Sequence, residues 1–318
     1  MLIVTGAVAF DHILSFSGRF SDHILPEKLH VINISVVTDT LKRHFGGTGG
    51  NQAYTLGLLG MHPVLLASAG TDFDEYDEHL RHGGVNTSYV GHSDKQLSAT
   101  AFALYDRDDN QIWGFAKNAM SEAVHLHLTQ VGEGVHFALI TPDDYKAVEQ
   151  YVSECCRKHI PFAFDPAFDI PKLDPAMLKK GVEHAEILFG NDYEISQLKK
   201  ITGLSHEKLI QQTIVVTTLA NKGSIIEKGE EKLVIPPAKA HRVVDPAGAG
   251  DAYRAGFLAG YLRKLDLGIC GRMGSLAAVY ALEHEGTIEH TFTIAEFKKR
   301  YKENFGSTLR LPEVNVLG

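Results

Sequence analysis

Cysteine is scarce in this sequence, and its spacing does not suggest a disulfide framework. The chain of 318 residues has three cysteines, of which Cys155 and Cys156 are adjacent and Cys270 lies far away. Because this spacing fits neither a disulfide pattern nor a metal site, we expect a protein of the reducing cytoplasm. Long apolar runs are also missing, and none could span a bilayer. The apolar residues 1–14 lack the features of a signal peptide, so we expect a buried first strand there.

Basic residues are outnumbered in this chain. It has 31 lysines and arginines against 39 aspartates and glutamates, a net charge of −8 with neutral histidines. A general nucleic-acid-binding protein needs a basic face, so the composition disfavours that class. A small anionic ligand stays compatible with it, because the local field of a pocket can oppose the net charge.

Two common nucleotide-binding fingerprints are absent from the sequence. There is no G-x-x-x-x-G-K-[ST] string, which excludes a P-loop of the Walker type. Two G-x-G strings occur at residues 47–49 and 248–250, but Gln52 and Tyr253 stand where a dinucleotide-binding turn needs its third glycine. A nucleotide, if one binds, must be held in another way.

Buried strands and helices alternate along most of the chain. Helical patterns span residues 51–60, 144–159 and 251–265. Between and around them lie near-continuous apolar runs, which are typical of strands buried on both faces, at residues 2–8, 64–70, 136–141, 161–166, 187–191 and 213–219. The alternation predicts an α/β fold of three layers, with a mostly parallel central sheet flanked by helices.

Three segments follow a different, period-two pattern. These are residues 31–38, 98–106 and 111–116, the last two joined by the polar turn RDDN. We interpret them as a small separate sheet that forms a lid; strands that extend the main sheet are the alternative. The expected catalytic core comprises residues 1–10, 40–87 and 121–318, and the lid residues 11–39 and 88–120.

The string DPAGAGDAYRAGF, residues 245–257, combines a glycine-rich turn with the start of a helix. Backbone N–H groups of Gly248, Ala249 and Gly250 can bind a phosphoryl group there, helped by the helix dipole. We expect the helix start to stabilise Asp251 in its ionised form, as a weak base. A weak base suffices for phosphoryl transfer, because the attacking hydroxyl loses its proton late. The alternative is that Asp251 merely caps the helix.

Four motifs in this order resemble the ribokinase-like carbohydrate kinases, also called the phosphofructokinase B family. They are FGGTGGNQAYTLGLLG at residues 45–60, NDYE at 191–194, TLANKG at 218–223 and the DPAGAGD string. The resemblance extends over essentially the whole chain. It implies a ribokinase-like fold with a small β-sheet lid, and an ATP-dependent kinase. In that family Asp251 matches the catalytic base, and the three residues before it match the anion hole.

The resemblance also implies a nucleotide site. Asn191 and Glu194 match the pair that organises Mg²⁺ through water near the nucleotide phosphates. Thr218 and Gly223 match the ends of the loop along ATP, in which Ala220 replaces the usual glycine. A monovalent cation such as K⁺ is a further candidate cofactor.

On the acceptor side, Asp11 matches the aspartate that binds sugar hydroxyls, at the end of the first strand. Gly46 and Gly47 would let the backbone approach the sugar closely. Asn51 offers both a donor and an acceptor. Without the resemblance, Asp11 and Asn51 would be interpreted as caps of a strand and a helix.

The segments at 111–123 and 277–293 are similar to the bacterial adenosine kinases within the family. This implies that the enzyme converts adenosine to AMP by phosphorylating its 5′-hydroxyl, with Phe102, Phe115 and Met120 of the lid around the purine. Residues 167–169, Ala-Phe-Asp, depart from that subgroup, as do Lys117 and Asn118.

Three alternatives therefore stay open: a ribose- or fructose-type sugar kinase, a nucleoside kinase of broad specificity, and a non-catalytic nucleoside-binding protein. The resemblance also implies a homodimer that forms through the lid, whose apolar face would otherwise meet water.

Overall fold

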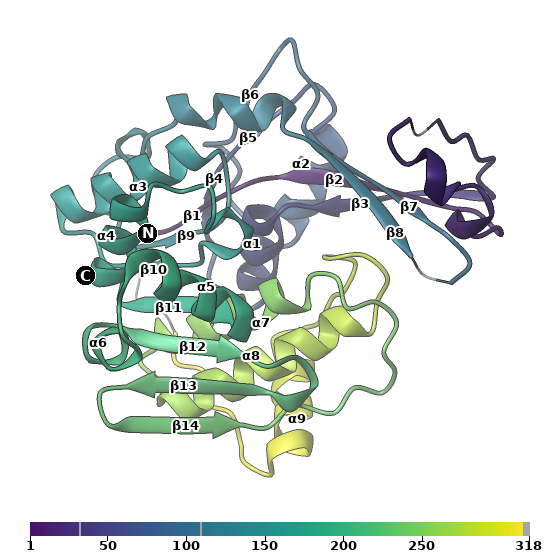
Figure 1. Ribbon diagram of the computed structural model, residues 1–318. Helices are drawn as coiled ribbons and strands as arrows, with labels where there is room; N and C mark the ends of the chain where they lie inside the picture. Colours follow the sequence, from purple (N-terminus) through teal and green to yellow (C-terminus); the bar gives the residue numbers. More distant parts are fainter. Residues whose placement is uncertain (32, 109, 314–318) are drawn as a thin grey trace.

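The computed structural model describes residues 1–31, 33–108 and 110–313. Its centre is an eight-stranded sheet in which neighbours from β4 to β12 run parallel, while β13 and β14 add an antiparallel edge. In order across the sheet (Figure 1), the strands are β14 (Glu231–Ile235), β13 (Ser224–Lys228), β12 (Ile214–Thr218), β11 (Ile187–Asn191), β10 (Phe162–Phe164), β9 (Phe137–Ile140), β1 (Leu2–Thr5) and β4 (Val64–Leu66). Each predicted apolar run contains one of these strands.

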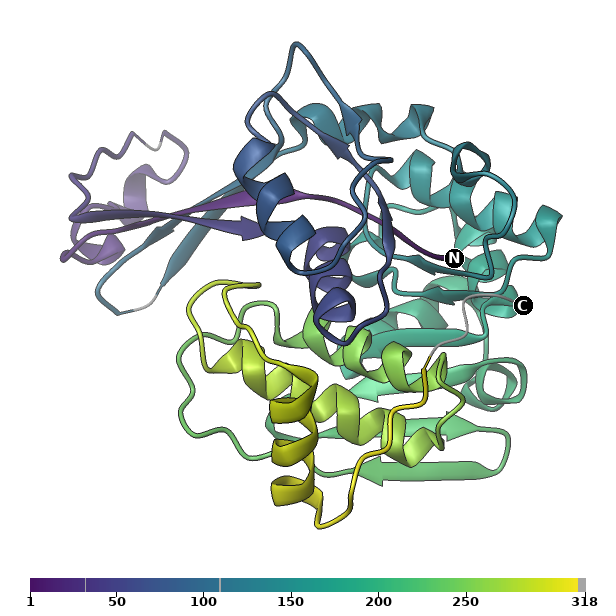
Figure 2. The same cartoon turned by 180° about the vertical axis from the view of Figure 1, so that it is seen from behind.

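Helices cover both faces of this sheet, because successive residues of each strand point to opposite sides. In β1, for example, Val4 belongs to one buried core and Ile3 to the other. The first core is closed by α1 (Thr48–Leu58), α2 (Asp74–His82), α7 (Ala249–Tyr261), α8 (Leu267–Leu282) and α9 (Ile294–Phe305). The second is closed by α3 (Tyr145–Lys158), α4 (Pro175–His184), α5 (Asp192–Thr202) and α6 (His206–Gln212). Figures 1 and 2 show the two helical layers from opposite sides.

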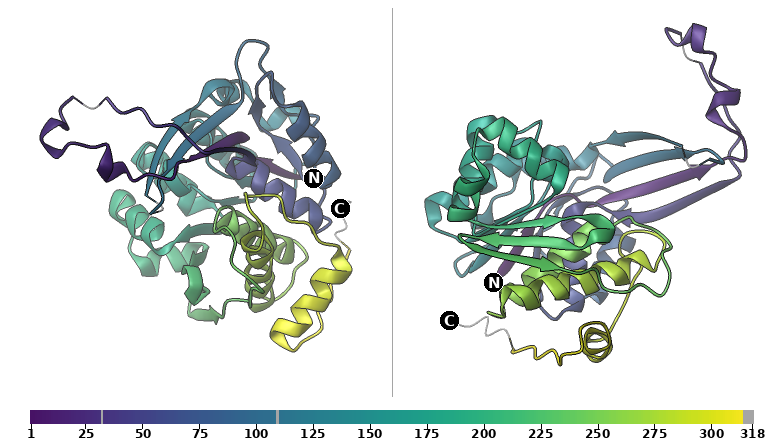
Figure 3. Two further views of the ribbon diagram at one scale, coloured as in Figure 1. Left: turned by 90° about the vertical axis from the view of Figure 1, so that its right-hand side faces the viewer. Right: turned by 60° about the horizontal axis from the view of Figure 1, so that its bottom comes forward.

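A second sheet of four strands extends away from the core and forms the lid (Figures 1 and 3). Its order is β3 (Thr40–Gly46), β2 (Ala9–Ser15), β7 (Ala99–Tyr105) and β8 (Gln111–Ala116). The predicted strand at 31–38 is wrong: residues 31 and 33–38 of the described chain form none, while residue 32 lies outside the described residues. Their side chains alternate in exposure, but β3 occupies the place beside β2. Thus residues 40–46, which the sequence assigns to the core, pair within the lid sheet.

The remaining elements are short. Strands β5 (Ser68–Ala69) and β6 (Gly91–His92) form a two-stranded sheet. An arm formed by residues 16–31 and 33–39 ends the lid and carries the 3-10 helices η1 (Phe20–Asp22) and η2 (Pro26–Lys28). Further 3-10 helices of the described chain are η3 (Asn118–His125), η4 (Leu128–Val131), η5 (Ala167–Asp169) and η6 (Ala220–Lys222). Among the described residues, no helix has the length and apolar character needed to cross a membrane.

Candidate active site

The glycine-rich turn before α7 forms an open helix start. Gly248 has φ of +72°, a left-handed conformation, and a Cβ there would lie 2.7 Å from the carbonyl oxygen of Thr287. Only glycine meets both conditions without strain. None of the described side chains caps this helix. Ala249 N–H makes a long bond of 3.4 Å to the carbonyl oxygen of Pro246. An open helix start of this kind can bind an anion, and a phosphoryl group at this turn stays a prediction.

Asp251 lies in the first turn of α7 and accepts hydrogen bonds on both carboxylate oxygens. Asn51 Nδ2 donates to Oδ2 at 2.9 Å, and Gln52 Nε2 donates to Oδ1 at 3.1 Å. Burial nevertheless raises the pKa of Asp251, although Arg254 and the two amides act in the opposite direction. The expectation that the helix start dominates and favours the ionised form is wrong, because desolvation is the larger effect. Asp251 is thereby a stronger base than the sequence indicates.

A second buried acid shares a hydrogen-bond donor, Gln52, with Asp251. Asp165, which follows β10, accepts a 2.7 Å hydrogen bond from Gln52 and forms an ion pair with Arg254 at 2.8 Å. Burial raises the pKa of Asp165 to about 7, despite the neighbouring guanidinium. Arg254 also lies 3.3 Å from Glu194. The Arg254 guanidinium thus contacts two carboxylates, those of Asp165 and Glu194.

Asn191 and Glu194 begin α5 with a reciprocal capping box. Asn191 Oδ1 accepts from the Glu194 backbone, and Glu194 Oε2 accepts from the Asn191 backbone, each at 2.8 Å. Because Asn191 ends β11, the cap fixes both side chains at the carboxyl edge of the sheet. Within the described residues there is no group of three or more His, Cys, Asp or Glu side chains that could hold a metal by themselves.

A cavity of about 610 Å³ opens beside this glycine-rich turn, the predicted anion-binding turn. Its lining includes Ala249, Gly250 and Asn191 as well as apolar side chains of α8 and of the segment before α7. Thr218 and Gly223, predicted to flank ATP, also line it. Ala220 lines it too, with φ of +50°, so the residue that replaces the usual glycine keeps a left-handed backbone.

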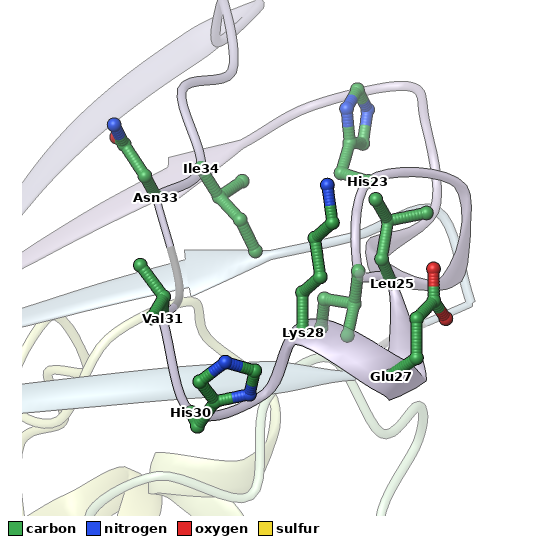
Figure 4. A pocket seen from close by; sticks show the side chains of 9 residues that line it. His23, Leu25, Glu27, Lys28, His30, Val31, Asn33 and Ile34 are labelled. Atoms are coloured by element: carbon green, nitrogen blue, oxygen red, sulfur yellow. The ribbon is translucent and has the colours of Figure 1, made fainter.

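A larger hollow of about 670 Å³ lies on the lid arm (Figure 4). Its lining consists of residues between His23 and Ile34, so it contains none of the predicted site residues. The 610 Å³ cavity, which reaches the anion-binding turn, is therefore the better candidate for a nucleotide.

Asp11 lies within β2 and not at the end of the first strand as the sequence predicts, because the chain leaves β1 after Thr5 and starts the lid strand at Ala9. Burial raises the pKa of Asp11 to about 6, with a smaller opposing effect of His44 and a reinforcing one of Asp245. A Cβ on Gly46 would lie 2.6 Å from Asp11 Oδ2, and one on Gly47 would lie 2.5 Å from the carbonyl oxygen of Ala7. The glycines thus make room for Asp11 and for Ala7, which lies between β1 and β2; their approach to a sugar stays a prediction.

The two predicted lid aromatics lie on opposite faces of the lid sheet. Asp11 pairs with Ala101, which pairs with Phe115, so these three share a face. Phe102 pairs with His12 and Gly114 on the other face and stacks on the His12 ring. The expectation that Phe102 and Phe115 flank one purine is therefore wrong for Phe102.

The reason is a register shift of one residue in the hairpin. A four-residue turn at 107–110 would pair Phe102 directly with Phe115. Instead β7 ends at Tyr105, opposite Gln111. Asp106 leaves the strand because its carboxylate accepts N–H bonds from Asp108 and Asn110, both at 2.9 Å. One residue of slip moves a strand's side chains to the other face.

Met120 is buried at the base of the lid. It packs with Ala7, Ala9 and Ala99 and is only 2% exposed. Its side chain thus supports the junction between lid and core, and a contact with a base stays a prediction.

Comparison with known proteins identifies the family. The profile of the pfkB family carbohydrate kinases matches residues 18–293. The chain belongs to the pfkB family. The nucleoside kinase of Methanocaldococcus jannaschii is 30% identical over 270 residues, which cover 82% of this chain and 86% of that protein.

Solved structures of a nucleoside kinase from Burkholderia thailandensis confirm the predicted ribokinase-like fold. Its complex with inosine is 31% identical, with a TM-score of 0.86 and coverage of 97% of this chain and 99% of that one. Its ADP-inosine complex is 32% identical, with a TM-score of 0.85 and complete coverage of both chains.

In this pfkB-family chain, the four sequence motifs meet at one edge of the central sheet, as the resemblance implies. Sequence reasoning missed Gln52, Asp165 and Trp113. Trp113 shares the face of Phe115, two residues away on β8, and the period-two pattern could have revealed it. No local signal points to the contacts of Gln52 and Asp165, which join distant segments.

Proposed function

We propose that the protein transfers the γ-phosphoryl group of ATP to the 5′-hydroxyl of a nucleoside, with adenosine the first expected acceptor. The observation that carries this proposal is the shared face of Asp11 and Phe115 beside the anion-binding turn. The two residues lie on strands separated by one other, hence about 10 Å apart. This separation suits a nucleoside whose ribose hydroxyls bind Asp11 and whose base stacks on Phe115.

A free sugar would use only half of this surface. It could bind Asp11, but it would leave Phe115 and Trp113 exposed to water, and both are already about half exposed, at 52% and 50%. Stacking of a base on an aromatic side chain contributes about 1–3 kcal/mol. The lid aromatics therefore favour a nucleoside over ribose or fructose.

The chemistry needs one base and one anion site. The acceptor oxygen attacks the γ-phosphorus, the bond from that phosphorus to the bridging oxygen of ADP breaks, and Asp251 takes the hydroxyl proton. The N–H groups at the start of α7 stabilise the charge on the transferred group. Closure of the lid would exclude water and align the reactants.

Mg²⁺ fits the polar groups near the cavity. Mg²⁺ keeps much of its water shell and binds one or two carboxylates together with substrate phosphates. Glu194 supplies one carboxylate at the capped start of α5, and Asn191 lines the cavity beside it. When bound with ATP, the ion would neutralise phosphate charge, and these two side chains would hold its water shell.

A homodimer through the lid is part of the proposal. The outer lid face, which bears Phe102, carries an apolar row across all four strands, formed in register by Leu41, Leu14, Leu104 and Ile112. Leu41 and Ile112 are 62% and 52% exposed in the single chain. A second copy would cover this face, and molar mass in solution measures the outcome.

An acceptor panel tests the proposed function. Purified protein with ATP and Mg²⁺ is incubated with adenosine, inosine, guanosine, cytidine, ribose or fructose 6-phosphate, and ADP release is measured. We expect the highest kcat/KM with a nucleoside. A sugar as the preferred acceptor would favour the sugar-kinase alternative, and nucleoside binding without ADP release would favour a non-catalytic protein.

A further inference from the structure

Gln52 lies between the two buried acids of the site. It is the residue after Asn51 on α1 and is fully buried. Its Nε2 lies 2.7 Å from Asp165 Oδ2 and 3.1 Å from Asp251 Oδ1. One amide nitrogen thus donates to both carboxylates, while Asn51 donates to the other oxygen of Asp251.

The orientation of this amide is determined by the acids. Among the described residues, Gln52 Oε1 has no hydrogen-bond partner, although it is buried. Exchange of the amide nitrogen and oxygen would bring a carbonyl oxygen against two carboxylate oxygens. An amide nitrogen carries two N–H donors, and the Gln52 nitrogen lies within hydrogen-bond distance of both acids. Both donors are therefore committed to Asp165 and Asp251.

Gln52 also completes a continuous polar path. Glu194 contacts Arg254, Arg254 contacts Asp165, Asp165 accepts from Gln52, and Gln52 donates to Asp251. The path begins at the residue proposed to hold the water shell of Mg²⁺ and ends at the proposed base. The contacts along this path fix the position of Asp251 relative to Glu194.

We propose that Gln52 is a positioning residue, which aims Asp251 at the acceptor hydroxyl and favours its ionised form. The proposal rests on the proposed function, because it needs Asp251 to act as the base. Gln52 does not touch substrate; it acts through Asp251.

The charged and titratable groups around Asp251 come from its own helix and from three other segments. Arg254 lies on the same helix, Glu194 on α5, Asp165 after β10 and Tyr76 on α2. The hydrogen bond from Gln52 lowers the pKa of Asp251, as does Arg254, while Glu194 raises it. Loss of the Gln52 donor leaves the other groups in place, so the acidic limb of the rate profile should move to higher pH.

The test compares Gln52→Met with Gln150→Met. Methionine is close to glutamine in size but cannot donate. Gln150 on α3 is a matched control, because its Nε2 also donates a short hydrogen bond, to Leu126 O at 2.6 Å, away from the site. We expect Gln52→Met to lower kcat about tenfold at neutral pH. The acidic limb of the kcat–pH profile of this variant should move to higher pH by about half to one unit, with KM values within about twofold of wild type.

Other outcomes separate the two proposals. An unmoved acidic limb in folded, active Gln52→Met overturns the positioning role, as does an equal shift in Gln150→Met. If Gln52→Met does not fold, Gln52→Asn keeps the amide but is one methylene shorter, and it should show the same shift. Wild-type protein that releases no ADP with any acceptor overturns the proposed function itself, and the role of Gln52 with it.

Discussion

Asn51 Nδ2 lies 2.9 Å from Asp251 Oδ2, although the two residues are 200 positions apart in the chain. The contact exists because α1 and α7 pack side by side under the same face of the sheet. The oxygen of the Asn51 amide accepts from Thr287, at 2.8 Å, so its nitrogen must point at Asp251. The glycine-rich motif at residues 45–60 and the DPAGAGD string therefore form one site.

The two faces of the lid sheet provide a matched pair of variants. Phe115→Ala removes the aromatic ring on the face of Asp11, and we expect it to raise the KM for nucleosides about tenfold, from lost stacking. Phe102→Ala removes a ring on the opposite face and should leave that KM within about twofold. Steady-state kinetics with adenosine and inosine measure both.

The result that would contradict this assignment is a larger effect of Phe102→Ala than of Phe115→Ala. The KM for ATP serves as the internal control, because neither ring lines the nucleotide cavity.

Acid should weaken acceptor binding through Asp11. Burial raises its pKa to about 6. Above that pH the carboxylate is ionised and can accept bonds from two ribose hydroxyls; below it, the proton occupies one acceptor position. We expect the KM for the nucleoside to increase as pH falls through about 6, with little change in the KM for ATP.

Asp11→Asn is the control for this titration. It should raise the nucleoside KM at neutral pH and remove the increase between pH 7 and 5. A wild-type KM that stays constant over this range, or a variant that keeps the increase, would assign the titration elsewhere.

Motifs with local physical meaning could be predicted from the sequence. Asn191 and Glu194 have the spacing of a capping box, and they form one at the start of α5. Gly248 has a left-handed backbone at the start of α7, and a glycine has no side chain that could cap the helix. These features depend on neighbours within a few residues, so the chain specifies them without knowledge of the fold.

Features that depend on register or distant contacts could not be predicted. The carboxylate of Asp106 binds the backbone of its own turn and ends β7 one residue early, which places Phe115 of β8 on the face opposite to that of Phe102. Gln52 meets Asp165 across 113 positions. The segment at 33–38 has the alternation of a strand but no partner, because β3 already pairs with β2.

Ala220 provides a test of backbone strain at the nucleotide cavity. Its φ of +50° disfavours any residue with a Cβ by about 1–2 kcal/mol. Glycine relieves this strain but costs roughly 0.5–1 kcal/mol in unfolded-state entropy. We expect Ala220→Gly to raise the free energy of unfolding by about 0.5 kcal/mol, measured by urea denaturation.

Ala278→Gly is the matched control, because Ala278 lines the same cavity from within α8. There glycine should lower the free energy of unfolding by about 1 kcal/mol. A loss of stability in both variants would show that the left-handed backbone at Ala220 carries no strain.

The most direct test of the account is the turnover of Asp251→Asn. The substitution keeps the size of the side chain and removes the base, so we predict unchanged thermal unfolding or a slight stabilisation, retained nucleoside binding, and ADP release lowered about 10³-fold. Turnover within about tenfold of wild type in the folded variant would contradict the assignment of Asp251 as the base.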